Sequence, residues 1–376
     1  MNFAKLVKTT SVIILAVFFL SLTCCSKSKI QQGLSFSIKN TEKAGNKNNK
    51  SKTKPRIGFS IASDTFILER WNKDIKIFSS EIAALGGEVL LQLSAGGTEA
   101  QITQIEYLLS KDIDALVVIP NDSDMLSGVI QQVVDKQIPV IAYDRPINGV
   151  PIDAYVSFDN KSVGILMAKS LTSMRPHGNY LIINGSKRDN NSYEVNRGIM
   201  SVLEPLVTRG EIEIKGQIWL NEWSFDEALK KADEVFAVST DFDAITCGND
   251  QIAEAVLQLL AERRLAGKIL VTGQDADLSA CQHIAEGTQF MTVYKPIKLL
   301  ATRAATVTMS LINGTPEQPD NYFPNKSNKP IPFYCEQPFA VTKDMLNGSE
   351  KYASPVGSFS VRGKEEKITV YTTSQI

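Results

Sequence analysis

Charged and amide side chains directly follow several apolar segments of this chain. Asp144 and Arg145 come after the apolar run 139–143, and Lys295 comes after 290–294. Three further apolar segments end in the same way, with Asn184, Asn249, Asp250, Asp275 and Asp277. A carboxylate accepts hydrogen bonds from two hydroxyls, and arginine donates in a fixed fork. This set of side chains therefore suits a ligand that carries neighbouring hydroxyl groups.

Two tryptophans lie in polar surroundings that fit the same kind of ligand. Trp71 is in LERWNKD (68–74), and Trp223 is in IWLNEWS (218–224). A sugar presents hydroxyls around its edge and C–H groups on its faces, and aromatic rings suit those faces. Taken singly, Trp71 is equally well explained as a core aromatic, and Asp144 with Arg145 as a surface ion pair. The recurrence of polar groups at several segment ends favours a binding site.

The alternation of apolar and amphipathic segments predicts how these residues are positioned. Strands are expected at 56–62, 88–94, 115–120, 139–143 and 154–158, and in a second series at 179–184, 211–219, 243–247, 268–273 and 290–294. Helices are expected between them, and one over 98–111 opens with Thr98 and Gln101 as a capping box. This alternation is typical of an α/β protein with two doubly wound, parallel-sheet lobes. Ligands bind beyond the carboxyl ends of such strands.

Composition excludes several other classes of function. The 376 residues are enough for two domains, and the net charge of −1 argues against nucleic acid as a partner. The chain has only two histidines, His177 and His283, and the single cysteine near either of them is Cys281, so too few ligands are grouped for a zinc site, and a Ser-His hydrolase is also disfavoured. No G-x-G-x-x-G opens the first helix, so a dinucleotide fold is not supported. We expect no cofactor and no metal.

The N-terminus predicts export and membrane attachment. Lys5 and Lys8 precede the apolar run 11–22, which is followed by Cys24 and Cys25. This pattern is typical of a lipoprotein signal (1–25) that ends at a lipidated cysteine, either Cys25 or Cys24; a plain secretory signal is the alternative. Residues 26–55 hold eight lysines and a single acidic residue, which predicts a flexible tether. The expected location is the periplasm or the outer face of the cytoplasmic membrane.

Several segments together resemble the D-xylose-binding periplasmic proteins of ABC importers, which are type I pentose- and hexose-binding solute-binding proteins. The matching segments are LERWNKD (68–74), QITQIEYLL (101–109), AYDRPI (142–147), VSFDNKSVG (156–164), NGSKRDNN (184–191), GND (248–250), GQDADL (273–278) and GTQFMTVYKPI (287–297). They occur in family order over roughly 56–345. The pair GQDADL and MTVYKPI is highly specific, whereas GND alone is weak.

The resemblance implies two lobes that close on a sugar, joined by crossovers near 158–161, 294–297 and 328–336. The first lobe would hold 56–160 with 298–327, the second 161–297 with 328–353, and 354–376 would be an extension. The implied sugar-binding residues are Arg70, Trp71, Asp144 and Arg145 from the first lobe, and Asn191, Trp223, Asn249, Asp275 and Lys295 from the second. Asn196 is added to this set because it falls where the family has a sugar-facing arginine.

These observations predict a non-enzymatic binder that captures a monosaccharide and delivers it to the membrane subunits of an ABC permease. Xylose is favoured, but glucose or galactose stays open because Asn196 and Ile67 depart from the family pattern and change local volume. A sugar sensor that docks a chemoreceptor or a sensor kinase is an alternative with the same lobes. A sugar-responsive repressor would need a helix-turn-helix where this chain has its signal and tether. An enzyme is disfavoured, since no phosphate loop or metal-ligand cluster is present.

Overall fold

The computed structural model describes residues 54–346, except 63–67 and 95, together with 354–359 and 368–372. Within these residues no helix is both long and apolar enough to cross a membrane. Cys24 and Cys25, the tether up to residue 53 and Ile67 lie outside the described residues.

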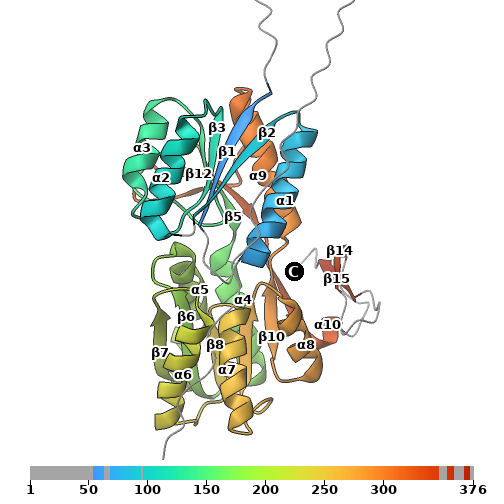
Figure 1. The fold of residues 1–376 in the computed structure, drawn as a ribbon. Helices are drawn as coiled ribbons and strands as arrows, with labels where there is room; N and C mark the ends of the chain where they lie inside the picture. Colours follow the sequence, from blue (N-terminus) through green and yellow to red (C-terminus); the bar gives the residue numbers. More distant parts are fainter. Residues whose placement is uncertain (1–53, 63–67, 95, 347–353, 360–367, 373–376) are drawn as a thin grey trace, which may run out of the picture. The chain divides into compact units, whose positions relative to one another are not determined.

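The first lobe is built on a seven-stranded sheet with the order β11-β12-β5-β4-β3-β1-β2. Figure 1 labels β1, β2, β3, β5 and β12 of this sheet. Its strands are parallel except for β11, which pairs antiparallel with β12. The strands are β1 (Arg56–Ala62), β2 (Glu88–Ser94), β3 (Ala115–Ile119), β4 (Val140–Tyr143), β5 (Ala154–Phe158), β11 (Asn321–Phe323) and β12 (Ile331–Glu336). The helices are α1 (Leu68–Ala84), α2 (Gly97–Leu109), α3 (Ser127–Asp135) and α9 (Ile297–Ile312).

Alternation along the strands of the first lobe supplies a core on each face of its sheet. In β3, Val117 belongs to the core under α1 and α9, while Leu116 and Val118 belong to the core under α2 and α3. Successive side chains of a strand point to opposite faces, so a fully apolar strand serves both layers. The sheet is therefore covered by helices on both sides, as the sequence predicts.

The second lobe has a six-stranded sheet with the order β13-β10-β9-β8-β6-β7, in which only β13 runs antiparallel to its neighbour. The strands are β6 (Gly178–Ser186), β7 (Ile212–Leu220), β8 (Ala244–Cys247), β9 (Leu270–Gln274), β10 (Met291–Tyr294) and β13 (Phe339–Thr342). The helices are α4 (Asn160–Met174), α5 (Asn190–Thr208), α6 (Phe225–Val238), α7 (Asp250–Glu262), α8 (Leu278–Glu286) and α10 (Lys343–Leu346). Strands β14 (Ser354–Phe359) and β15 (Ile368–Thr372), in the predicted extension, pair with each other.

The third passage between the lobes lies later in the chain than the resemblance implies. Strand β12 pairs parallel with β5 in the first sheet, whereas β13 pairs with β10 in the second. The chain therefore crosses between Glu336 and Phe339, and the first lobe keeps the segment 328–336 that was assigned to the second. The other two passages, from β5 to α4 and from β10 to α9, lie at 158–160 and 294–297, close to their expected positions.

The predicted capping box of α2 is replaced by contacts to the end of β3. The hydroxyl of Thr98 donates to Oδ1 of Asn121 at 3.0 Å, and no side chain caps this helix. The amide of Gln101 is buried; it donates to the carbonyl of Ile119 at 2.8 Å and accepts from the backbone N–H of Asn121 at 2.8 Å. A buried strand end left unpaired costs more than an exposed helix start, so these side chains bond the sheet.

Helices α4 and α5 pack with their backbones in direct contact. A Cβ added to Gly164 would lie 1.9 Å from the carbonyl oxygen of Val195, and a Cβ added to Gly198 would lie 2.0 Å from that of Lys161. Such distances leave no room for any side chain. The two glycines therefore set how closely α4 and α5 approach, and this helix pair covers one face of the second sheet.

Candidate functional site

Two aspartates occupy equivalent positions in the two sheets. Asp144 follows β4 and Asp275 follows β9, and each backbone N–H continues the ladder to the neighbouring strand, to the carbonyls of Val156 and Val293, at 2.8 Å. Both aspartates have positive φ, 62° and 100°. This conformation costs a side-chain-bearing residue about 1 kcal/mol or more. Each lobe thus places one carboxylate at the end of a strand, on a residue with positive φ.

Arg70 joins these two carboxylates across the lobes. It lies in the first turn of α1 and forms an ion pair with Asp144, and its Nη1 lies 3.5 Å from Oδ1 of Asp275. The same oxygen of Asp275 is 2.7 Å from Nζ of Lys295. Burial opposes the charge of Asp275, but Lys295 and Arg70 outweigh it and hold the pKa of Asp275 below its usual range. The carboxylate therefore stays ionised at neutral pH.

The ring of Trp71 lies beneath the arginines. The guanidinium of Arg70 is 4.6 Å from the ring centroid and that of Arg145 is 5.8 Å from it, distances at which cations are attracted to an aromatic face. The Trp71 side chain is 1% exposed. The structure therefore places Trp71 in the predicted cluster, as the platform on which two arginines are held.

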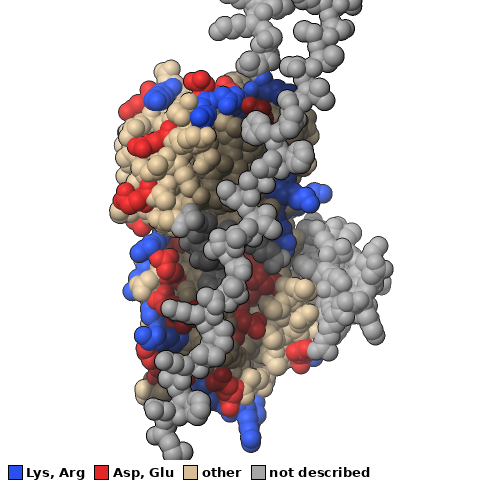
Figure 2. Space-filling view, in the orientation of Figure 1, with Lys and Arg blue, Asp and Glu red and all other residues tan. Residues whose placement is uncertain are grey.

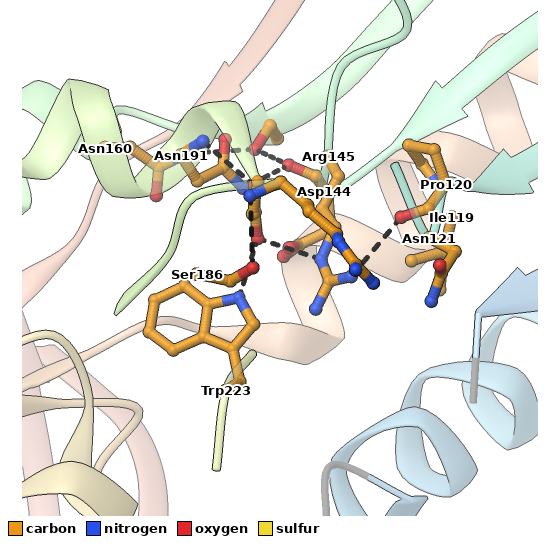
Figure 3. Close-up of polar contacts among 12 residues, drawn as sticks. Ile119, Pro120, Asn121, Asp144, Arg145, Asn160, Ser186, Asn191 and Trp223 are labelled. Carbon is orange, nitrogen blue, oxygen red and sulfur yellow. Dashed lines mark hydrogen bonds and ion pairs between the residues drawn. The ribbon is translucent and has the colours of Figure 1, made fainter. Parts of the chain in front are cut away.

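A second group of polar residues lies around Asp144 and Arg145 (Figure 3). Nε of Arg145 is 2.9 Å from Oδ2 of Asp189, and its Nη1 donates to the carbonyl of Pro120 at 3.3 Å. Nδ2 of Asn191 donates to the backbone carbonyl of Asp144 at 2.9 Å. Arg145 and Asp144 belong to the first lobe and Asp189 and Asn191 to the second, so this group also spans the lobes.

Asp189 also belongs to this cluster, although the sequence analysis did not single it out. Its Oδ2 accepts a hydrogen bond from Nε1 of Trp223 at 3.1 Å, and its Oδ1 caps α5 by accepting from the N–H of Asn191 at 2.9 Å. Burial raises the pKa of Asp189, although the charge of Arg145 opposes that shift. A signal was present in the sequence, since Asp189 lies in NGSKRDNN between the end of a strand and Asn191.

Asp74 supports Arg70 from behind and was also missed. It is fully buried, accepts a hydrogen bond from the hydroxyl of Tyr143, and lies 3.9 Å from Nε of Arg70 one turn along α1. Burial raises the pKa of Asp74 to about 7, against the opposing charge of Arg70 and the bond from Tyr143. The i,i+4 spacing of Arg70 and Asp74 is the sequence signal that could have identified this pair.

The remaining predicted residues fall in two places. Asn249 follows β8 and caps α7, with its Oδ1 accepting from the N–H of Ile252 at 2.9 Å. Asn196 instead contacts Gln217 of the edge strand β7, whose Nε2 donates to its Oδ1 at 2.7 Å. The described contacts do not bring Asn196 to the cluster, because five residues of helix rotate a side chain by about 140° from Asn191.

The described part of the chain holds no group of His, Cys, Asp and Glu that could bind a metal ion. Its cysteines are all free thiols: Cys247 and Cys281 are buried and Cys335 is partly buried. Figure 2 shows acidic and basic side chains interspersed over the visible face. The side chains that meet in the cluster are carboxylates, amides and cations.

Comparison with known proteins finds a matching family model and two similar relatives that carry the same name. The family described as "Periplasmic binding protein domain" matches residues 63–316. The chain is 41% identical over 294 residues to the D-xylose-binding periplasmic protein of Haemophilus influenzae, covering 78% of this chain and 87% of that protein. It is 40% identical over 292 residues to the protein of that name in Escherichia coli, covering 77% and 88%.

Two solved structures that resemble this chain are also sugar-binding solute-binding proteins. A carbohydrate transporter solute-binding protein from Chloroflexus aurantiacus, in complex with D-glucose, superposes with a TM-score of 0.73 at 25% identity and covers 79% of this chain and 95% of that one. An ABC transporter solute-binding protein from Clostridium phytofermentans with bound β-D-glucose gives 0.69 at 27% identity, covering 80% and 98%.

Proposed function

Because this chain belongs to the periplasmic binding protein family, we propose that it binds a monosaccharide, xylose in preference, and delivers it to the membrane subunits of an ABC permease. The observation that carries this proposal is the position of Arg70 between the lobes. Its guanidinium is paired with Asp144 of the first lobe and lies close to Asp275 of the second. Neighbouring sugar hydroxyls would be held between these groups. Their carboxylates accept, while Arg70 and Lys295 donate.

Binding in this proposal involves no bond making or breaking. Interactions made in the closed arrangement would shift a population of open and closed lobes, and the closed form would be the one that the permease recognises. A micromolar affinity corresponds to about 8 kcal/mol. A few charge-assisted hydrogen bonds and the burial of sugar C–H groups against Trp223 are of the right size to supply it.

The choice of xylose rests on the relatives rather than on any one contact. Both proteins near 40% identity are named D-xylose-binding, whereas the two solved structures hold glucose at lower identity. Glucose differs from xylose by an exocyclic hydroxymethyl group, which a pocket shaped for a pentose excludes by crowding. Asn196 gives no reason to prefer a hexose, since its described contact is with Gln217.

A calorimetric panel tests the proposed ligand. The purified protein should bind xylose more tightly than ribose, arabinose, glucose or galactose, because a pentopyranose fills the pocket without an additional group to place. Isothermal titration at a single pH and ionic strength gives the five affinities. Glucose or galactose binding at least tenfold more tightly than xylose would overturn the pentose assignment, and no binding of any of the five would overturn the monosaccharide proposal.

We also propose that the chain is anchored outside the cytoplasmic membrane by a lipid on Cys24 or Cys25. The charged start, the apolar run 11–22 and the small residues before the cysteines support this proposal. Changing both cysteines to serine should move the protein from the membrane fraction to the soluble fraction, as measured by blotting after ultracentrifugation. The two single variants then identify the modified cysteine. A double variant that sediments with membranes as the wild type does would exclude the lipid anchor.

A further inference from the structure

We propose that Asp189 is a positioning residue whose ion pair with Arg145 holds the lobes together around the bound sugar and so sets how slowly the sugar leaves. This inference rests on the proposed sugar-binding function. Asp189 is positioned on its own lobe by the N–H of Asn191 and by Nε1 of Trp223. Its bond with Nε of Arg145, at 2.9 Å, crosses to the other lobe.

The burial of this ion pair indicates that it stabilises the lobes only when they are in contact. The side chains of Arg145 and Asp189 are each 4% exposed. Two charges removed from water are stabilised only when their geometry is good and their other hydrogen-bonding atoms are satisfied. When the lobes separate, both charges return to water, so the pair contributes to the joined state alone.

Both partners are already oriented before they meet. Nη1 of Arg145 donates to the carbonyl of Pro120 within the first lobe, while Asp189 is fixed at the start of α5 within the second. Little side-chain freedom is lost when such groups pair, so more of the interaction energy stabilises closure. Breaking one partner of a buried, hydrogen-bonded charge pair acts mainly on the dissociation rate.

Asp189 also connects three of the predicted sugar-binding residues, since Arg145, Asn191 and Trp223 all contact it. A sugar that contacts these three would be held most rigidly when Asp189 bonds all of them together. Loss of the Arg145 bond alone would leave the pocket of the second lobe in place. The expected signature is therefore a faster release with an almost unchanged capture rate.

Asp189→Asn separates this role from simple capping. Asparagine caps helices as well as aspartate does, so the start of α5 is kept while the charge is lost. Stopped-flow tryptophan fluorescence with the tightest-binding sugar of the panel should show a dissociation rate constant raised at least tenfold and an association rate constant changed less than threefold. An unchanged dissociation rate, or a loss confined to association, would overturn the proposal.

Two further variants keep the result interpretable. Asp243→Asn removes a carboxylate that accepts from the backbone N–H of Asn179 within the second lobe, and it should leave both rate constants unchanged within twofold.

Arg145→Gln removes the cation that pairs with Asp189. In a double-mutant cycle its effect on release should be at least fivefold smaller in the Asp189→Asn background than in the wild type. Additive effects would show that the two residues act independently. Failure of the wild type to bind any sugar would instead refute the proposed function.

Discussion

Replacement of Asp275 by alanine is expected to weaken sugar binding about a hundredfold. In the structure its Oδ1 lies 2.7 Å from Nζ of Lys295 and 3.5 Å from Nη1 of Arg70. Without the carboxylate, two largely buried cations face each other with no negative charge between them, and the proposed ligand loses an ionised acceptor. Breaking such a pair costs several kcal/mol, of which about 2.7 kcal/mol in binding corresponds to a factor of a hundred.

Isothermal titration of Asp275→Ala against the panel sugar measures this loss, and thermal unfolding checks that the variant is folded. The control is Asp135→Ala, which removes an exposed carboxylate at the end of α3 that accepts from Gln131 in the same helix. The control should bind the sugar as the wild type does. An affinity of Asp275→Ala within threefold of the wild type would remove Asp275 from the site.

A single methyl group at Gly164 is expected to destabilise the protein by about 3 kcal/mol. Its Cβ would lie 1.9 Å from the carbonyl oxygen of Val195, and a backbone atom cannot rotate away from it. Helices α4 and α5 would have to separate, which loosens the core that includes Val163, Val195 and Ile199. Overpacking of this kind costs 1–3 kcal/mol or more.

Urea unfolding of Gly164→Ala, followed by circular dichroism, measures the loss as a lower transition midpoint. Gly128→Ala is the matched control, because a Cβ added to that helical glycine of α3 meets no atom within 4 Å. Alanine forms helices better than glycine by about 1 kcal/mol, so the control should be at least as stable as the wild type. Equal midpoints for Gly164→Ala and the wild type would contradict the packing described for this helix pair.

The regular part of the fold follows from sequence alone because its strands are mostly apolar segments that are separated by amphipathic helices. The edge strands β11 and β13 do not follow in this way. They are only three and four residues long, and each pairs antiparallel with its one neighbouring strand. Such segments carry too few residues for a period to be recognised. The third passage between the lobes was therefore placed too early.

The polar cluster was predicted in outline because strand ends of a parallel sheet meet at one edge. The sequence signals for Asp189 and Asp74 are local and weak, whereas the partners that reveal their roles, Arg145 and Tyr143 respectively, are distant in the sequence. Asn196 is the opposite case: the resemblance predicts that it binds the sugar, but its described contact is with Gln217. The resemblance located its position in the chain, but the face of α5 that it occupies depends on the helix start, which sequence reasoning could not fix to within one residue.

The interleaving of the two lobes along the chain reverses the usual order of assembly during synthesis. The second sheet, apart from its edge strand β13, is encoded continuously between β6 and β10. The first sheet lacks β12 until residue 336 has been made, and the face that carries Phe59 and Tyr143 lacks α9 until residue 312 has been made. Domains at the start of a chain generally fold first. Here the ribosome must release almost the whole chain before the lobe that begins it can complete its core.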